Sequence, residues 1–146
     1  MRALLQRVSR ASVSVASVTI GSIDGGLLVL LGVFREDTEA QARWLAAKTF
    51  NCRIFRDTDK PMNRSVGDVD GSILVVSQFT LAADTTRGNR PGFGHAAPPE
   101  RAQALYEIYL ESLRELTPRV WSGQFGADMR VELVNDGPVT ILLERK

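Results

Sequence analysis

The chain has 146 residues, of which 44% are hydrophobic, and its 18 Lys and Arg nearly balance its 17 Asp and Glu. This length suffices for one domain with an ordinary hydrophobic core. A formal net charge of +1 excludes a strong electrostatic attraction of the whole molecule to nucleic acid or membrane. A nucleic-acid partner would therefore have to be bound locally, at one of its ends or in a pocket. The single cysteine, Cys52, excludes an intramolecular disulfide and a multi-cysteine zinc site.

Membrane insertion and export are not expected. No segment approaches the roughly 20 apolar residues of a membrane-spanning helix, and the opening stretch MRALLQRVSRASVSV lacks the apolar run of a signal peptide. We therefore expect a soluble, cytoplasmic protein with one domain over residues 1–146. No cofactor or metal is expected, for want of His/Cys clusters and phosphate-loop motifs.

The first half of the chain reads mainly as strands with one helix. Alternating side chains predict strands at 2–9 and 12–20, before a turn-rich loop at 21–26. The continuous apolar run 26–33 is typical of a strand covered on both faces. Apolar residues at helical spacing predict a helix in DTEAQARWLAAKTF, where Thr38 and Gln41 resemble a capping box. A short strand is expected at 53–55.

The second half begins with another strongly apolar strand, SILVVSQFTL, at 72–81. The long loop that follows has no periodicity, and loops of that length are usually functional or disordered. PERAQALYEIYLESLREL, residues 99–116, is a clear amphipathic helix. Alternation predicts two last strands, at 129–133 and 139–143, separated by the turn-forming residues Asn135-Asp136-Gly137-Pro138.

This order predicts an α/β fold with three layers, α/β/β. Two strands come first, then two strand–helix units, then up to three strands. The two helices can cover only one side of the sheet, which must fold over into a barrel-like shape or be covered by more strands or a second subunit.

Common catalytic groups are scarce. The single histidine, His95, would form a triad only with Ser77 or Thr80 as nucleophile and Asp84 as orienting acid, and nothing in the sequence brings these residues together. Cys52 lies between apolar neighbours, which indicates a buried thiol rather than an activated one.

Two segments carry more information. Strand 72–81 becomes polar only at its carboxyl end, where ligands bind in open α/β sheets. Its hydroxyl and amide groups there, Ser77, Gln78 and Thr80, could equally satisfy backbone groups in the next turn. In NDGP, Pro138 removes a ladder donor and restricts Gly137. By pattern alone it is an ordinary turn with a trans bond, since cis occurs in only about 5–6% of Xaa-Pro bonds.

Together these segments, VSQFTLAADTTRGNRP and LVNDGPVT, resemble the SQFTL and NxGPVT motifs of D-aminoacyl-tRNA deacylases. The resemblance continues through QRVSRASV, GLLVLLGV, RIFRDTDKPMN and GQFGADMRVEL, in the same order over residues 1–143. Where the family usually has Gly-Lys before Met62, this chain has Lys60-Pro61. A related family that acts on L-alanine has altered motifs and a trans Gly-Pro, which the intact SQFTL and NDGPVT argue against here.

The resemblance implies hydrolysis of the ester that joins a D-amino acid, or glycine, to the 3′-terminal adenosine of tRNA. It implies a homodimer with active sites at the subunit interface, into which a cis Gly137-Pro138 of the partner inserts to exclude L side chains. Arg7 would hold that dipeptide, and Val139 and Thr140 complete the motif.

The resemblance implies that the first motif lines the catalytic wall of the active site. The Phe79 backbone N–H would be the oxyanion donor, and Ser77, Gln78 and Thr80 would position the ester and adenosine. The resemblance also implies that water attacks the ester, assisted by the RNA 2′-hydroxyl. Candidate phosphate contacts are Arg87, Arg90 and Arg101. Two alternatives remain: a non-catalytic module that binds aminoacyl-tRNA or adenosine ends, and a His95-dependent hydrolase.

Overall fold

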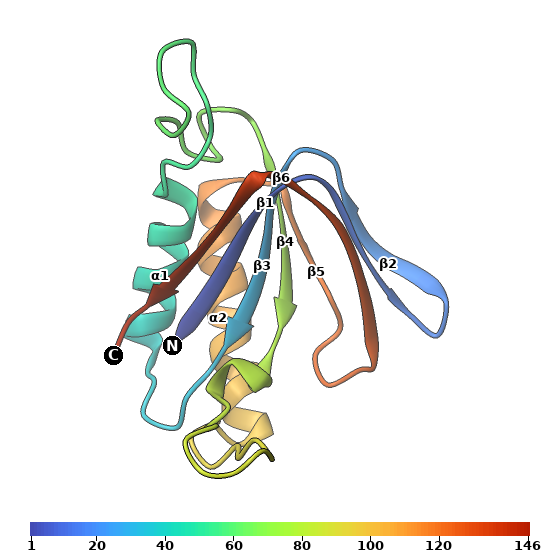
Figure 1. The fold of residues 1–146 in the computed structure, drawn as a ribbon, viewed down its shortest axis with the longest axis vertical. Helices are drawn as coiled ribbons and strands as arrows, with labels where there is room; N and C mark the ends of the chain where they lie inside the picture. Colours follow the sequence, from blue (N-terminus) through green and yellow to red (C-terminus); the bar gives the residue numbers. More distant parts are fainter.

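The computed structural model describes all 146 residues, from Met1 to Lys146. Six strands form one mixed sheet, and two α-helices cover one side of it (Figure 1). In chain order they are β1 (Arg2–Val15), β2 (Val18–Ile23), β3 (Gly26–Gly32), α1 (Glu39–Asn51), β4 (Ser72–Ser77), the short 3₁₀ helix η1 (Phe79–Ala82), α2 (Pro99–Leu116), β5 (Val120–Ser122) and β6 (Met129–Glu144).

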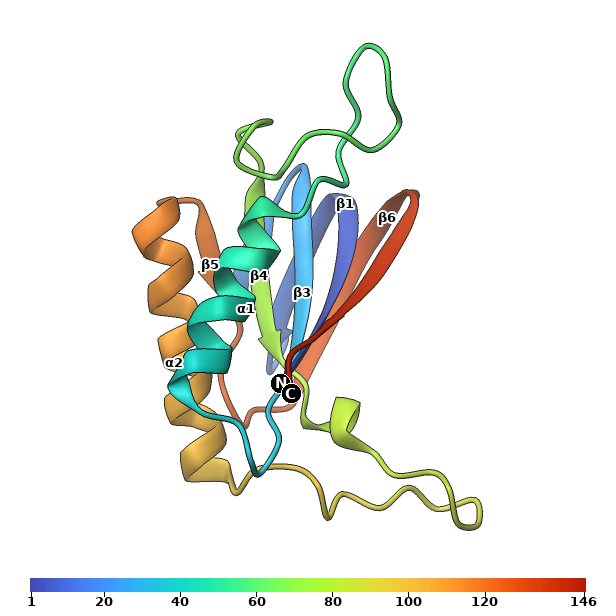
Figure 2. The same ribbon diagram turned by 90° about the vertical axis from the view of Figure 1, so that its left-hand side faces the viewer.

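The long strand β1 is the hinge of the sheet. Its first half, 2–8, pairs antiparallel with β3, and its second half, 11–15, pairs antiparallel with β2. β6 runs antiparallel along nearly all of β1, and β3, β4 and β5 are parallel. The sheet therefore folds over, with β2 and the first half of β6 forming a flap away from the helices (Figures 1 and 2).

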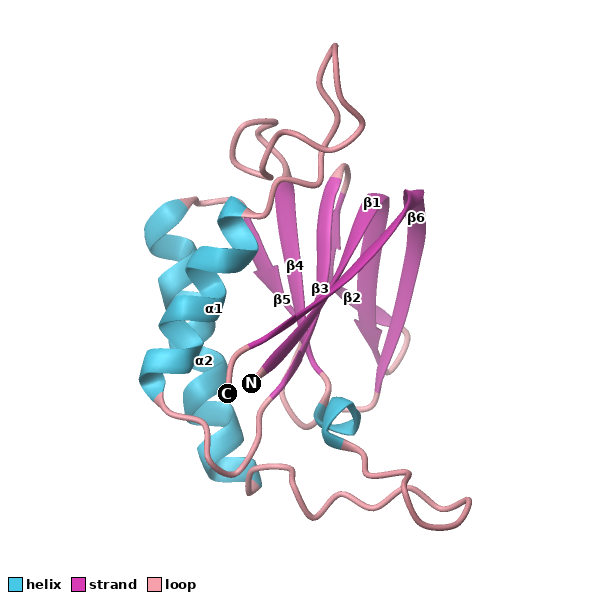
Figure 3. Cartoon of the chain, turned by 60° about the vertical axis from the view of Figure 1, so that its left-hand side comes forward, coloured by secondary structure: helices cyan, strands magenta, loops and turns pink.

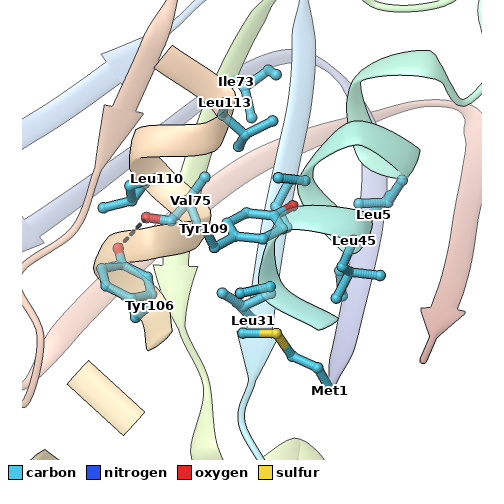
Figure 4. Packing of buried hydrophobic residues seen from close by; sticks show 14 of the residues in the cluster. Met1, Leu5, Leu31, Leu45, Ile73, Val75, Tyr106, Tyr109, Leu110 and Leu113 are labelled. Carbon is cyan, nitrogen blue, oxygen red and sulfur yellow. Dashed lines mark hydrogen bonds between the residues drawn. The ribbon is translucent and has the colours of Figure 1, made fainter. Parts of the chain in front are cut away.

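Two apolar clusters separate three layers. The larger, with 22 buried residues, lies between the helices and the sheet and is centred on residues such as Leu45, Tyr109 and Leu113 (Figure 4). The smaller, with 7 buried residues, lies inside the folded sheet. Successive residues of a strand point to opposite faces, so Ile73 and Val75 of β4 join the first cluster while Leu74 and Val76 join the second. The predicted α/β/β layers are confirmed (Figure 3).

The helices begin and end where local chemistry dictates. The Thr38 backbone N–H donates to the Gln41 side chain, so the capping box at the start of α1 is confirmed. α2 begins at Pro99, whose missing N–H costs nothing in a first turn, and it ends at Leu116, before Thr117-Pro118.

Several predicted boundaries were wrong. The break expected between 9 and 12 is absent, because the hairpin turns at Ala16-Ser17, whose positive φ angles of 47° and 66° suit a tight primed turn. Neither residue is a usual signal for that turn. The strand expected at 53–55 is a single bridge between Phe55 and Arg64.

The last two predicted strands are one strand, β6, and the expected turn at NDGP lies within it. β1 continues as a pairing partner on both sides of this segment, so the chain bulges outward there instead of reversing. The strand expected at 72–81 ends at Ser77, because its neighbour β3 ends at Gly32 and the chain turns into η1.

No helix in the structure is both long and apolar enough to cross a membrane.

Candidate active site

A cavity of about 570 Å³ opens at the carboxyl ends of β3 and β4. Ser77, Gln78 and Phe79 line it together with Phe125 of the loop after β5 and Met129 at the start of β6. Tyr106 of α2 and Leu31 of β3 contribute to its apolar wall. The predicted SQF segment therefore lies at the mouth of a mostly apolar pocket.

The turn into η1 leaves backbone donors available at this mouth. A helix cannot satisfy the N–H groups of its first residues, and the hydrogen bonds of η1 begin with the Leu81 N–H, which donates to the Gln78 carbonyl. The N–H groups of Phe79 and Thr80 come earlier in the chain and take no part in that bond. Two adjacent amides at the start of a helical turn form a favourable site for an oxyanion.

Phe79 and Thr80 of the motif are exposed, whereas Ser77 and Gln78 are partly buried. The Phe79 ring is 58% exposed and meets the Phe93 ring edge-on, with centroids 5.1 Å apart. The Gln78 side-chain amide hydrogen bonds to the Thr80 hydroxyl. No histidine, lysine or carboxylate is bonded to that hydroxyl, so Thr80 has no base that would make it a nucleophile.

The second motif forms a bulge on β6. Val8 pairs with Asn135 and Gln6 pairs with Thr140, so residues 136–139 stand opposite Arg7 alone. The Asn135 side-chain amide closes the bulge by donating to the carbonyls of Arg7, at 3.0 Å, and Val139, at 3.1 Å.

Arg7 supports this bulge from beneath. Its side chain is only 3% exposed. Nε donates to the Asp136 carbonyl at 3.1 Å and lies 3.3 Å from the Asp136 carboxylate, while Nη1 donates to the Ile54 carbonyl at 2.6 Å. Arg7 is therefore buried and paired, and the Asp136 that it binds belongs to the same chain.

Gly137 is the close-packed point of the bulge. Its φ is +119°, and a Cβ added there would lie 2.3 Å from Nη2 of Arg7. Gly137, Pro138 and Thr140 are exposed, whereas Val139 is buried. Gln6 donates to the Thr140 hydroxyl at 3.3 Å.

The Gly137-Pro138 bond is trans, because no peptide bond in the structure is cis. The cis isomer implied by the resemblance is therefore not found in this chain, which adopts the isomer that most Xaa-Pro bonds prefer.

The two motifs do not meet within one chain. The residues that line the cavity include Ser77, Gln78 and Phe79 but neither Arg7 nor any residue of 136–140. In one copy of the chain the two motifs are thus separate.

The other candidates are not assembled for catalysis. The His95 side chain is exposed and makes no hydrogen bond, and the Asp84 carboxylate accepts from Thr86, whose bonds hold the pKa of Asp84 below its usual range. Burial raises the pKa of the half-buried Cys52 thiol, which makes it a poorer nucleophile.

Among the three candidate phosphate ligands, Arg101 has a structural contact, since it donates to the Asp37 carbonyl at 2.7 Å. Arg87 and Arg90 are exposed in the loop after η1. Lys60 shapes its own loop, because its backbone N–H donates to the Asp57 carboxylate.

Sequence reasoning missed part of the cavity wall. Phe93, Tyr106, Phe125 and Met129 come from three separate segments. Tyr106 lies on the buried face of the amphipathic helix α2, and nothing in a periodic pattern shows that one edge of such a residue faces a cavity. The aromatic residues of the two loops carried the only available signal.

Comparison with known proteins finds a matching family model and similar curated proteins. A family model described as D-Tyr-tRNA(Tyr) deacylase matches residues 4–144. A D-aminoacyl-tRNA deacylase of Paracoccus denitrificans (strain Pd 1222) is 59% identical over 144 residues, which cover 99% of this chain and 97% of that protein.

Two solved structures have the same fold. One, described as "c-Myc DNA Unwinding Element Binding Protein", is 43% identical with a TM-score of 0.95 and covers 100% of this chain and 99% of its own. The other, "Structural Analysis of a probable eukaryotic D-amino acid tRNA deacylase", has a TM-score of 0.84 at 18% identity and 97% coverage of each chain.

Proposed function

Because the chain belongs to the D-Tyr-tRNA(Tyr) deacylase family of hydrolases, we propose that it hydrolyses the ester of D-aminoacyl-tRNA and releases the D-amino acid and tRNA. The observation that carries the proposal is the position of the SQF segment. Ser77, Gln78 and Phe79 line the mouth of the apolar cavity, and the first amides of η1 precede the helix's own hydrogen bonds.

The chemistry needs few side chains. Water adds to the ester carbonyl, the Phe79 N–H donates to the oxygen that becomes negative, and the bond to the 3′ oxygen of the terminal adenosine then breaks. The departing oxygen takes up a proton. Fixed backbone donors stabilise this charge without reorganising, and a positioned substrate removes much of the entropic barrier. The 2′-hydroxyl of the RNA would assist the water, since no protein base hydrogen bonds to Thr80.

Chirality would be read by a second copy of the chain. In this proposal the bulge at Gly137-Pro138 of one subunit enters the cavity mouth of the other, where its backbone leaves no room for an L side chain. Glycyl-tRNA would also be hydrolysed, since glycine has no side chain to exclude.

Two features support such a dimer. The two motifs lie apart in one chain, and Gly137 and Pro138 are exposed although Arg7 is buried to hold them. In addition, Leu30, Leu4 and Leu142 form an apolar row across β3, β1 and β6, in which Leu30 and Leu4 are partly buried and Leu142 is 51% exposed. A second copy of the chain that packs on this row would bury the apolar surface that Leu142 exposes.

A direct assay tests the function. Purified protein is incubated with D-tyrosyl-tRNA, L-tyrosyl-tRNA and glycyl-tRNA, each in excess. We expect repeated turnover of the D and glycyl esters and none of the L ester. Equal release from both tyrosyl esters, or binding of the D ester without turnover, would contradict the proposal, and the second outcome would identify a binding module. A His95→Ala variant should remain active.

Mixing two inactive variants tests the shared site. A Phe79→Pro variant lacks the proposed donor and a Gly137→Ala variant has a distorted bulge, so each should be inactive alone. If subunits share the site, a mixed dimer contains one site with both halves intact and recovers activity. A mixture that stays inactive although the subunits exchange would overturn the shared site and leave the ester hydrolysis unaffected.

A further inference from the structure

Arg2 lies at the centre of the last row of paired residues in the sheet, next to η1. Arg2 of β1 pairs with Gly32 of β3 on one side and with Glu144 of β6 on the other. Its guanidinium lies over the Phe34 ring, with Cζ 4.9 Å from the ring centroid, and Nε is 3.5 Å from the Glu144 carboxylate. These contacts on several sides hold an arginine whose side chain is 31% exposed.

The guanidinium also reaches η1. Nη1 of Arg2 donates to the Leu81 carbonyl at 2.8 Å, two residues after Phe79. No other side chain donates to a backbone carbonyl of η1. The positive charge lies where a short helix presents its carbonyl groups, which is the favourable end for a cation.

Gly32 of β3 lies in close contact with η1. A Cβ at Gly32 would lie 2.8 Å from the Leu81 Cβ and 3.2 Å from the Gln78 carbonyl oxygen. The turn therefore rests directly on the β3 backbone. Neighbouring residues in one row thus hold η1 on two sides: Gly32 through contact and Arg2 through a charged hydrogen bond.

A turn of four residues needs such support. The hydrogen-bond geometry of 3₁₀ helices is poor, and one turn fixes several dihedral angles for very few bonds. A donor that stabilises an oxyanion must be held within about 0.5 Å of its productive position. The amides at the start of η1 cannot supply that precision themselves.

We propose that Arg2 is a positioning residue for hydrolysis, which fixes the Phe79 amide by clamping the Leu81 carbonyl, a role that rests on the proposed function. Arg2 acts through η1 and does not touch the reacting atoms. Lysine could supply one donor but not the planar group that also lies on Phe34 and faces Glu144.

The test compares Arg2→Met with Arg145→Met. Arg145 is a matched control, because its guanidinium also lies over an aromatic ring, with Cζ 5.0 Å from the Trp44 centroid, but it has no contact with η1. We expect Arg2→Met to lower kcat for D-tyrosyl-tRNA about 10-fold with KM within about 2-fold, as for a displaced donor. Arg145→Met should leave both constants unchanged, and Arg2→Lys should recover part of kcat.

A second measurement is independent of turnover. Amide hydrogen exchange and ¹H–¹⁵N shifts of residues 79–82 should change in Arg2→Met and in Gly32→Ala, whose added methyl group would push Leu81 away, but not in Arg145→Met. Unchanged amides in Arg2→Met, or equal losses of kcat in the two arginine variants, would overturn the positioning role. If the unmodified protein hydrolyses no D-aminoacyl ester, the proposed function fails, while the amide signals still report whether Arg2 fixes the turn.

Discussion

Arg7 and Asp136 are joined by two contacts through one nitrogen: Nε of Arg7 donates to the Asp136 carbonyl at 3.1 Å and lies 3.3 Å from its carboxylate. The bulge that presents Gly137 and Pro138 is thereby attached to the centre of β1. The guanidinium also donates through Nη1 to the Ile54 carbonyl, which connects the bulge to the segment after α1.

Replacing Arg7 should weaken both the fold and the site. In Arg7→Met the Ile54 carbonyl loses its buried donor and Asp136 loses its ion pair, so we expect the free energy of unfolding to fall by about 3 kcal/mol. Urea denaturation measures this loss. The control is Arg43→Met, because Arg43 forms an exposed ion pair with Glu39 at 3.8 Å, and such pairs contribute little. Equal midpoints for the two variants would contradict a structural role for Arg7.

Gly137→Ala should distort the bulge specifically. The added methyl group would meet Nη2 of Arg7 at 2.3 Å, and a φ of +119° is unfavourable for alanine, so we expect a loss of about 1–3 kcal/mol in unfolding free energy together with loss of D-ester hydrolysis.

Gly88→Ala provides the comparison for Gly137→Ala. Gly88 also has a positive φ, of +67°, but a Cβ there meets nothing within 4 Å. This variant should lose only the conformational part of the stability, about 1 kcal/mol, and retain its activity. If both variants remain fully active, contact between Gly137 and Arg7 has no part in the site.

The sequence predicted the layers and the two motifs but not how the second motif is presented. Hydrophobic periodicity records which residues face a core, and so the strands, helices and α/β/β order could be predicted. Asn135 to Pro138 have the composition of a turn, and only the register with β1 decides that they bulge within one strand. The end of β4 was misplaced for the same reason, since it depends on where β3 stops.

Thr80→Ala tests the role of the first motif. The Thr80 hydroxyl hydrogen bonds to Gln78 and to no base, so its removal should lower kcat less than about 10-fold, whereas loss of a true nucleophile costs about a million-fold in a serine hydrolase. Single-turnover hydrolysis of D-tyrosyl-tRNA distinguishes the two values. Complete loss of hydrolysis with an unchanged fold would make Thr80 a catalytic nucleophile.

Tyr106 should make the stability of the protein depend on alkaline pH. Burial raises the pKa of Tyr106 from its ordinary value near 10 to about 12. The folded state therefore keeps the phenol proton between pH 10 and 12 while the unfolded state releases it, so the free energy of unfolding falls as pH rises through this window. Two pH units correspond to about 2 to 3 kcal/mol.

Tyr106→Phe isolates this contribution. At pH 8 the variant should be less stable by about 1 kcal/mol, because the phenol no longer donates to the Val75 carbonyl. That bond is 3.0 Å long (Figure 4). The loss stays small because the Gly123 N–H still donates to the same carbonyl, at 2.9 Å. Above pH 10 the variant cannot ionise at this position, so its stability should fall less steeply and the order of stability should reverse at about pH 11. Urea titrations from pH 8 to about 11.5 measure both curves, and parallel curves would show that Tyr106 ionises equally easily in the folded and unfolded chain.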